Sequence, residues 1–143
     1  MADDEATLFH RGLTLFNEGH YFDAHEAWED AWHLVTGPRR DYYQGLIQCA
    51  VALEHVRRGN PRGALMVFAR AKPRLQPYPS PYMGIDWHAL ARRLEQLLAP
   101  LEALPKDRLQ PRKHGQTLPV DLTQAPTITL QHDPFDQTQG QGG

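Results

Sequence analysis

The sequence predicts an all-α fold: a compact bundle of about five helices, followed by an irregular C-terminal tail. Apolar residues recur at helical spacing through residues 1–104, and most of these runs stop close to Gly or Pro. Residues 105–143 instead hold five prolines and seven glutamines. A chain of 143 residues has the length of one ordinary domain. We therefore expect a helical bundle domain at 1–104 and a Pro/Gln-rich tail at 105–143, partly packed or disordered.

The helices are expected at about residues 5–18, 21–35, 39–58, 61–75 and 87–103. Gly19 and Gly59 mark the ends of the first and third helices. Asn60 supplies an N-cap and Pro61 a first helical residue for the fourth. Four prolines in the segment 73–81 predict a linker before the fifth helix.

A weak internal repeat relates the first two helices to the next two. A shift of 40 residues places Leu13, Gly19, Ala24 and Trp28 on Leu53, Gly59, Ala64 and Phe68. This spacing resembles half of a tetratricopeptide signature and predicts two helical hairpins. Two units are fewer than a solenoid needs, so a closed bundle is favoured.

One stretch of the tail has a regular pattern of apolar residues. Apolar residues alternate with polar ones between Leu118 and Leu130, which predicts a short extended piece packed along the bundle or on a neighbouring subunit. Residues 137–143 are expected to be disordered.

Composition excludes several classes of protein. The net charge of -2 gives no general basic field for nucleic acid or an anionic membrane, although residues 57–74 are locally basic. A single cysteine, Cys49, rules out an internal disulfide and is expected to be a buried spectator. The longest apolar stretch, around 46–53, is too short to span a bilayer. We expect a cytoplasmic protein, with a homo-oligomer as an open alternative to a monomer.

Ionisable and aromatic side chains share one face of the second helix. His25 and Glu29 point the same way, flanked by Trp28, Trp32 and Glu26. On the third helix a second polar stripe falls within roughly 80° of rotation, and its members are Arg40, Gln44, Gln48, Val51 and His55. Helices joined by a short connection are antiparallel neighbours, so the two stripes are expected to face each other.

Three interpretations of these stripes stay open. They are a functional pocket, a structural hydrogen-bond network that fixes helix register, or two unrelated solvated faces. In the functional case His25, Glu29 and His55 hold a divalent metal ion of unknown identity, and Glu26 is the general base on a bound water. The substrate-binding or network residues are then Trp32, Arg40, Gln44, Gln48 and Asp86. For Asp86 a helix cap is favoured over a contribution to the polar site. The pattern His-Glu-x-x-Glu lacks the second histidine of the zincin motif, which removes a peptidase of that type.

A different class of function is a non-catalytic helical interaction module. Its tetratricopeptide-like groove and basic fourth helix would bind a protein, with the polar stripes serving as a structural network. The partner is therefore an unknown small molecule or protein.

These residues resemble the bacterial and archaeal domain-of-unknown-function family 309 over about residues 8–100. The resemblance rests on Leu15-Phe16-Asn17-x-Gly19-x-Tyr21-Phe22-x-Ala24-His25-Glu26-x-Trp28-Glu29-x-x-Trp32, Arg40, Tyr43-Gln44-Gly45-Leu46-Ile47-Gln48, His55, Gly59-Asn60-x-x-Gly63-Ala64 and Gly84-Ile85-Asp86. It implies a small all-helical bundle, sometimes described as a predicted metal-dependent hydrolase. The positions carried over are His25, Glu26, Glu29, Trp32, Arg40, Gln44, Gln48, His55, Asn60, Gly63 and Asp86. The tail lies outside the resemblance.

Overall fold

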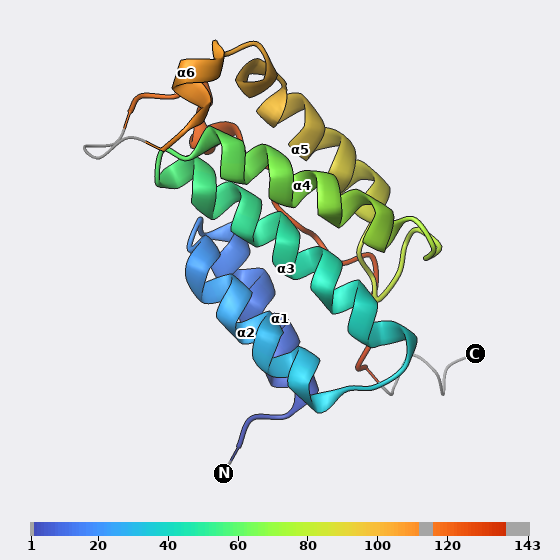
Figure 1. Ribbon diagram of the computed structural model, residues 1–143. Coiled ribbons are helices and arrows are strands. Elements are labelled where there is room, and N and C mark those ends of the chain that lie inside the picture. Colours follow the sequence, from blue (N-terminus) through green and yellow to red (C-terminus); the bar gives the residue numbers. More distant parts are fainter. Residues whose placement is uncertain (1, 112–115, 137–143) are drawn as a thin grey trace.

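The computed structural model describes residues 2–111 and 116–136, and the described residues form six α-helices and one 3-10 turn (Figure 1). They are α1 (Glu5–Asn17), α2 (Tyr21–Leu34), α3 (Pro38–Arg57), α4 (Pro61–Leu75), α5 (Trp87–Glu102), α6 (Lys106–Leu109) and η1 (Leu122–Gln124). All five predicted helices are confirmed, whereas α6 and η1 were not predicted. No strand occurs in the described ranges, so the all-α class is confirmed.

The first four helices form the two hairpins that the internal repeat predicted. α1 pairs with α2, α3 pairs with α4, and α2 packs against α3. Both tight turns need a glycine, because Gly19 and Gly59 have φ angles of +84° and +74°. Their N–H groups donate to carbonyls of the preceding turn, which ends α1 and α3 at these positions.

The core is built around aromatic side chains that the hairpins enclose. Trp28, Tyr42 and Tyr43 are completely buried. The Trp28 indole donates from Nε1 to the Phe9 carbonyl at 3.2 Å, so its one polar atom is satisfied inside the core. The apolar repeat positions that correspond in the two hairpins are all buried, namely Leu13 and Leu53, Ala24 and Ala64, and Trp28 and Phe68.

Side-chain caps begin the last two long helices. Asn60 Oδ1 accepts from the Gly63 N–H at 3.0 Å at the start of α4. The Asp86 carboxylate accepts from the Ala89 N–H at 3.0 Å, so Asp86 is the helix cap of α5 that the sequence indicated. Pro73 lies inside α4, although the predicted linker began there. Pro73 removes one N–H donor and crowds the preceding turn, and α4 ends two residues later at Leu75.

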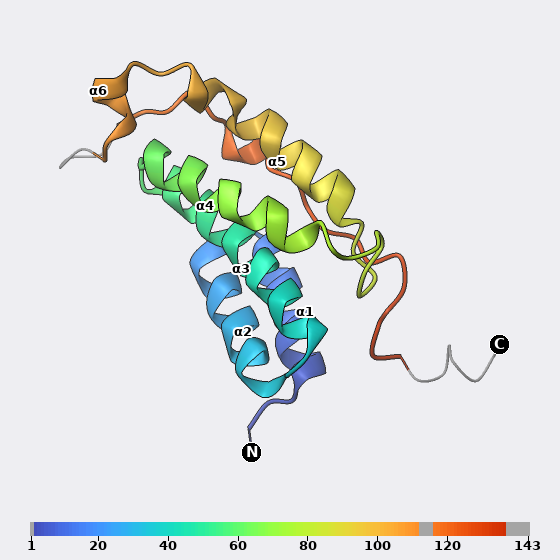
Figure 2. The same ribbon diagram turned by 45° about the vertical axis from the view of Figure 1, so that its right-hand side comes forward.

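Residues 116–136 run back along the bundle as an extended segment (Figure 2). Pro126 and Ile128 are buried, and the segment passes between α1 and α5. The predicted disorder at 137–143 lies outside the described residues. None of the helices in the described ranges has the length and apolar character needed to cross a membrane.

Candidate functional site

The two predicted polar stripes meet at both ends of the α2–α3 pair. At one end, the Arg40 guanidinium lies 3.7 Å from the centre of the Trp32 ring, a close cation–π contact. At the other end, His25 of α2 and His55 of α3 line the same pocket. The structure therefore brings together residues that are up to 30 positions apart in the sequence.

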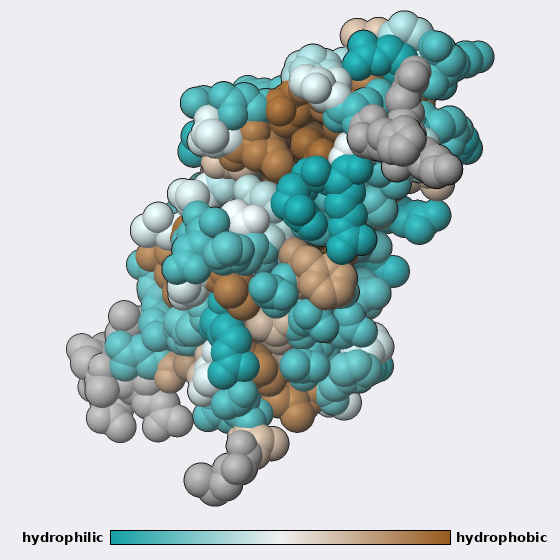
Figure 3. All heavy atoms as spheres, turned by 90° about the vertical axis from the view of Figure 1, so that its left-hand side faces the viewer, coloured by the Kyte–Doolittle hydropathy of each residue, from teal (hydrophilic) through white to brown (hydrophobic). Residues whose placement is uncertain are grey.

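This α2–α3 pocket has a volume of about 190 Å³ and is lined by Phe22, His25, Val51, Glu54, His55 and Arg58. It opens beside Phe22, whose side chain is exposed although it is apolar. Figure 3 shows the side of the molecule on which α2 lies, where apolar residues adjoin strongly hydrophilic ones. An aromatic wall next to charged groups suits an amphiphilic ligand.

His25 is held by two acceptors on its own helix. Its Nε2 lies 3.0 Å from the Glu29 carboxylate and its Nδ1 lies 3.1 Å from the Phe22 carbonyl. Only a ring that carries protons on both nitrogens can donate to both. Since the Glu29 side chain is 49% exposed, this pair contributes little to stability.

His55 is oriented by the cap of the next helix. Asn60 Nδ2 lies 3.2 Å from His55 Nδ1, and the amide orientation follows from the bond between Asn60 Oδ1 and the Gly63 N–H. Nδ1 therefore accepts, and the neutral ring carries its proton on Nε2. Burial lowers the pKa of His55, Arg58 lowers it further, and Glu54 opposes both. The ring accordingly offers an N–H donor at Nε2.

Glu54 is the main feature of the pocket that the sequence prediction missed. It is buried, yet Arg57 binds both of its carboxylate oxygens at 2.7 and 2.6 Å and Arg58 Nε adds a bond at 2.7 Å. The bonds from Arg57 are the main reason why the pKa of Glu54 is lowered. Arginines three and four positions after a glutamate are a helical ion-pair pattern, which could have identified this group in advance.

The metal site predicted at His25, Glu29 and His55 gains no support from the described residues and stays a prediction. Among the residues that the structure describes, no three His, Cys, Asp or Glu side chains converge as a metal-binding group. The Nδ1 atom of His55 is occupied by Asn60, and His25 Nε2 is occupied by Glu29. Glu26, the predicted general base, is exposed on α2 and does not line the pocket. No hydrolytic step follows from this geometry.

The remaining predicted residues have separate places. Gln44 and Gln48 are half-buried along α3, and Gln48 Oε1 and Arg40 Nε are buried polar atoms without a hydrogen-bond partner in the described residues. Asp86 lies at the start of α5, outside the α2–α3 pocket. Cys49 is buried, as expected, and burial raises the pKa of its thiol to about 12.

Two relatives each match about two thirds of this chain. An uncharacterised protein of Aquifex aeolicus (strain VF5) is 30% identical over 99 residues, which are 68% of this chain and 30% of that relative. This chain thus corresponds to under a third of that protein's length. The crystal structure of a conserved hypothetical protein from Thermus thermophilus is 34% identical, with a TM-score of 0.58, and the match covers 69% of this chain and 99% of that chain.

The family model for a domain of unknown function (DUF309) matches residues 9–67. These residues include α2, α3 and the whole lining of the α2–α3 pocket. The sequence, the helical architecture and the solved relative agree: the chain belongs to the DUF309 family of helical proteins of unknown function.

Proposed function

We propose that this protein binds a small organic anion in the α2–α3 pocket, without a metal ion. The observation that carries this proposal is the meeting of Arg58 and His55 with two apolar walls, Phe22 and Val51, in one small pocket. A carboxylate at one end and an apolar group at the other is the ligand chemistry that such a lining complements.

The unused donors at the pocket favour an anion. Glu54 and Glu29 bring two negative charges to the pocket and its border, and Arg57 and Arg58 bring two positive charges that offset them. Arg58 uses only Nε for Glu54, and its two terminal nitrogens have no hydrogen-bond partner among the described residues. A guanidinium with a free edge binds a carboxylate through two parallel hydrogen bonds. The Nε2–H of His55 is a further donor.

The apolar part of the ligand is limited by the volume. A cavity of roughly 150 Å³ is known to hold benzene, and this pocket has about 190 Å³. One ring or a short branched chain therefore fits beside Phe22 and Val51.

Benzoate is the simplest probe of this proposal, with neutral benzamide as its matched control. In isothermal titration calorimetry we expect benzoate to bind at one site and benzamide to bind at least roughly tenfold more weakly, because charge-assisted bonds contribute about 1.5–3 kcal/mol each. Arg58→Gln should reduce benzoate affinity by a similar factor. Arg70→Gln, an exposed change on α4 away from the pocket, should not.

Two results would contradict the proposal. One is the absence of benzoate binding to the wild-type protein at millimolar concentration. The other is equal benzoate affinity of the Arg58→Gln and Arg70→Gln variants, which would show that binding does not involve this pocket.

A further inference from the structure

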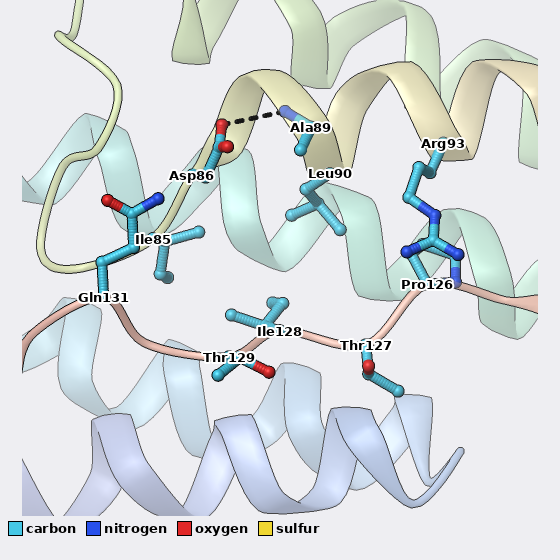
Figure 4. Close-up of a pocket in the computed structure, with 10 residues that line it drawn as sticks. All are labelled: Ile85, Asp86, Ala89, Leu90, Arg93, Pro126, Thr127, Ile128, Thr129 and Gln131. Carbon is cyan, nitrogen blue, oxygen red and sulfur yellow. Dashed lines mark hydrogen bonds between the residues drawn. The ribbon is translucent and has the colours of Figure 1, made fainter.

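A second feature lies between α1 and α5, where the chain's own residues 122–135 occupy a groove. We call this surface the tail groove and define it by His10 and Asn17 of α1, Gly84 and Ile85 before α5, and Leu90 of α5. Figure 4 shows the extended segment passing along α5, with Ile128 pointing toward Ile85 and Leu90.

Asn17 forms two hydrogen bonds with the backbone of the segment at Ile128. Its Nδ2 donates to the Ile128 carbonyl at 2.8 Å, and its Oδ1 accepts from the Ile128 N–H at 2.7 Å. This paired contact satisfies both backbone groups of one extended residue, as a neighbouring strand would. It does not depend on the side chain at that position, so it suits any extended peptide.

Gly84 provides a second contact to the backbone. Its carbonyl accepts from the Gln131 N–H at 2.8 Å. A Cβ atom at this position would clash with the His132 carbonyl oxygen, and the φ angle is +75°. Only glycine allows the two main chains to approach so closely. The groove is therefore shaped to admit a polypeptide backbone.

Three side chains fix the direction and register of the segment. Ile128 is only 7% exposed where it packs on the bundle, Asp133 lies 3.1 Å from His10 Nε2, and the Phe135 ring packs on Phe9 with centroids 5.4 Å apart. The pattern is an aliphatic residue, an acid five positions later and an aromatic ring two positions after that. Along this pattern the segment runs antiparallel to α1.

The segment does not fill the groove. Hollows of about 280 and 370 Å³ border it, one against α5 and the other at the turn between α1 and α2. Exposed threonines, Thr127 and Thr129, flank the buried Ile128. A peptide with larger side chains at the flanking positions could therefore be held by the same backbone contacts.

We propose that the tail groove is a binding site for an extended peptide, and that residues 122–135 are its built-in, displaceable occupant. The partner has an aliphatic residue at the Asn17 position, an acid that pairs with His10 and an aromatic ring that contacts Phe9. The segment has no strand and no α-helix of its own and lies outside the family match at 9–67. About three tenths of this chain has no counterpart in the solved relative, which is itself matched over 99% of its length.

The test uses full-length protein and a fluorescent peptide with the sequence of residues 120–136. In the wild type the tethered segment competes at a high effective concentration, of the order of millimolar, so the peptide should bind weakly. Ile128→Asp in the protein removes the buried anchor, and we expect peptide affinity, measured by fluorescence anisotropy, to rise at least tenfold. Adding Asn17→Leu should abolish that gain, whereas Asp30→Leu, an exposed change on α2 that lines neither hollow, should not.

These variants distinguish a peptide site from a tail that is only structural. If hydrogen exchange shows residues 122–131 released in Ile128→Asp but the peptide does not bind, the proposal is wrong. Equal affinity with and without Asn17→Leu would also overturn it. If Ile128→Asp does not fold, Asp133→Arg replaces it, because within the described part of the chain this partly exposed side chain makes only the pair with His10 and a bond from the Phe135 N–H. It should raise peptide affinity above that of the wild type, and no rise would again contradict the proposal.

Discussion

The α2–α3 pocket and the tail groove use opposite means of recognition. The pocket is lined by side chains whose ion pairs are local, since Glu54 binds arginines three and four residues later. The groove is held by backbone contacts between residues that are 111 positions apart, at Asn17 and Ile128. A side-chain lining selects the chemistry of a ligand, whereas a backbone contact selects an extended conformation. One bundle thus offers a chemically selective site and a conformationally selective one.

The largest expected difference between the two regions comes from Ile128→Asp. Placing a carboxylate in this buried position should reduce the free energy of unfolding by about 2–4 kcal/mol. Urea denaturation gives the magnitude, and hydrogen exchange should show loss of protection at 122–131 but not in α2 and α3. Thr129→Asp, at an exposed position in the same segment, is the control. Equal losses for both variants would mean that Ile128 is not the anchor.

On the pocket side, Glu54→Gln should have the next largest effect. The amide cannot accept bonds from two arginines as a carboxylate does, so we expect a loss of about 1–2 kcal/mol in the free energy of unfolding. Glu95→Gln, which removes an exposed partner of Lys72, should cost less than about 0.5 kcal/mol. Equal losses in the free energy of unfolding for Glu54→Gln and Glu95→Gln, measured in parallel urea titrations, would contradict this prediction.

The pH dependence of stability distinguishes the regions further. The unfolded chain protonates His55 near pH 6.5, whereas the folded protein does so only at lower pH, because burial lowers the pKa of this side chain. Stability from this residue is therefore complete above pH 6.5 and decreases as the pH falls through the lowered value. Urea titrations between about pH 5 and 8 should show a weaker decline for His55→Gln than for the wild type. Identical pH profiles would contradict this assignment.

The smallest effect is expected for Glu29→Gln. The pair between His25 and Glu29 is largely solvated, so its loss should cost only about 0.3–0.5 kcal/mol. A difference above about 1 kcal/mol in thermal or urea unfolding would indicate that the polar stripe is mainly a structural network. Such a result would favour the structural interpretation over a ligand site.

The helices were predictable because their signals are local. Gly19, Gly59 and the Asn60–Pro61 pair mark helix ends with side chains or φ angles that depend on a few neighbouring residues. The facing of Arg40 and Trp32 also followed from helical periodicity and a short connection. Both arguments need only the geometry of helices that follow one another along the chain.

The rest of the site depended on contacts that periodicity does not contain. The hydrogen bonding of His55 depends on Asn60, because the Asn60 amide lies against the Nδ1 atom of the ring. Local sequence signals indicated Asn60 only as a helix cap. Glu54 was not singled out from the sequence, although Arg57 and Arg58, three and four residues later, form a helical ion-pair pattern with it. The hydrogen bonds between the Asn17 side chain and the Ile128 backbone could not be predicted. Alternation of apolar and polar residues in the tail indicates an extended segment, but it does not indicate the surface on which that segment lies.

The separation between Asn17 and Ile128 has a consequence for how the protein is made. The groove is complete in the sequence once Leu90 has been synthesised, and Ile128 follows 38 residues later. At about 5–20 residues per second on the ribosome, the nascent helices precede their own tail by a few seconds. During every round of translation, another extended chain can therefore reach this surface first.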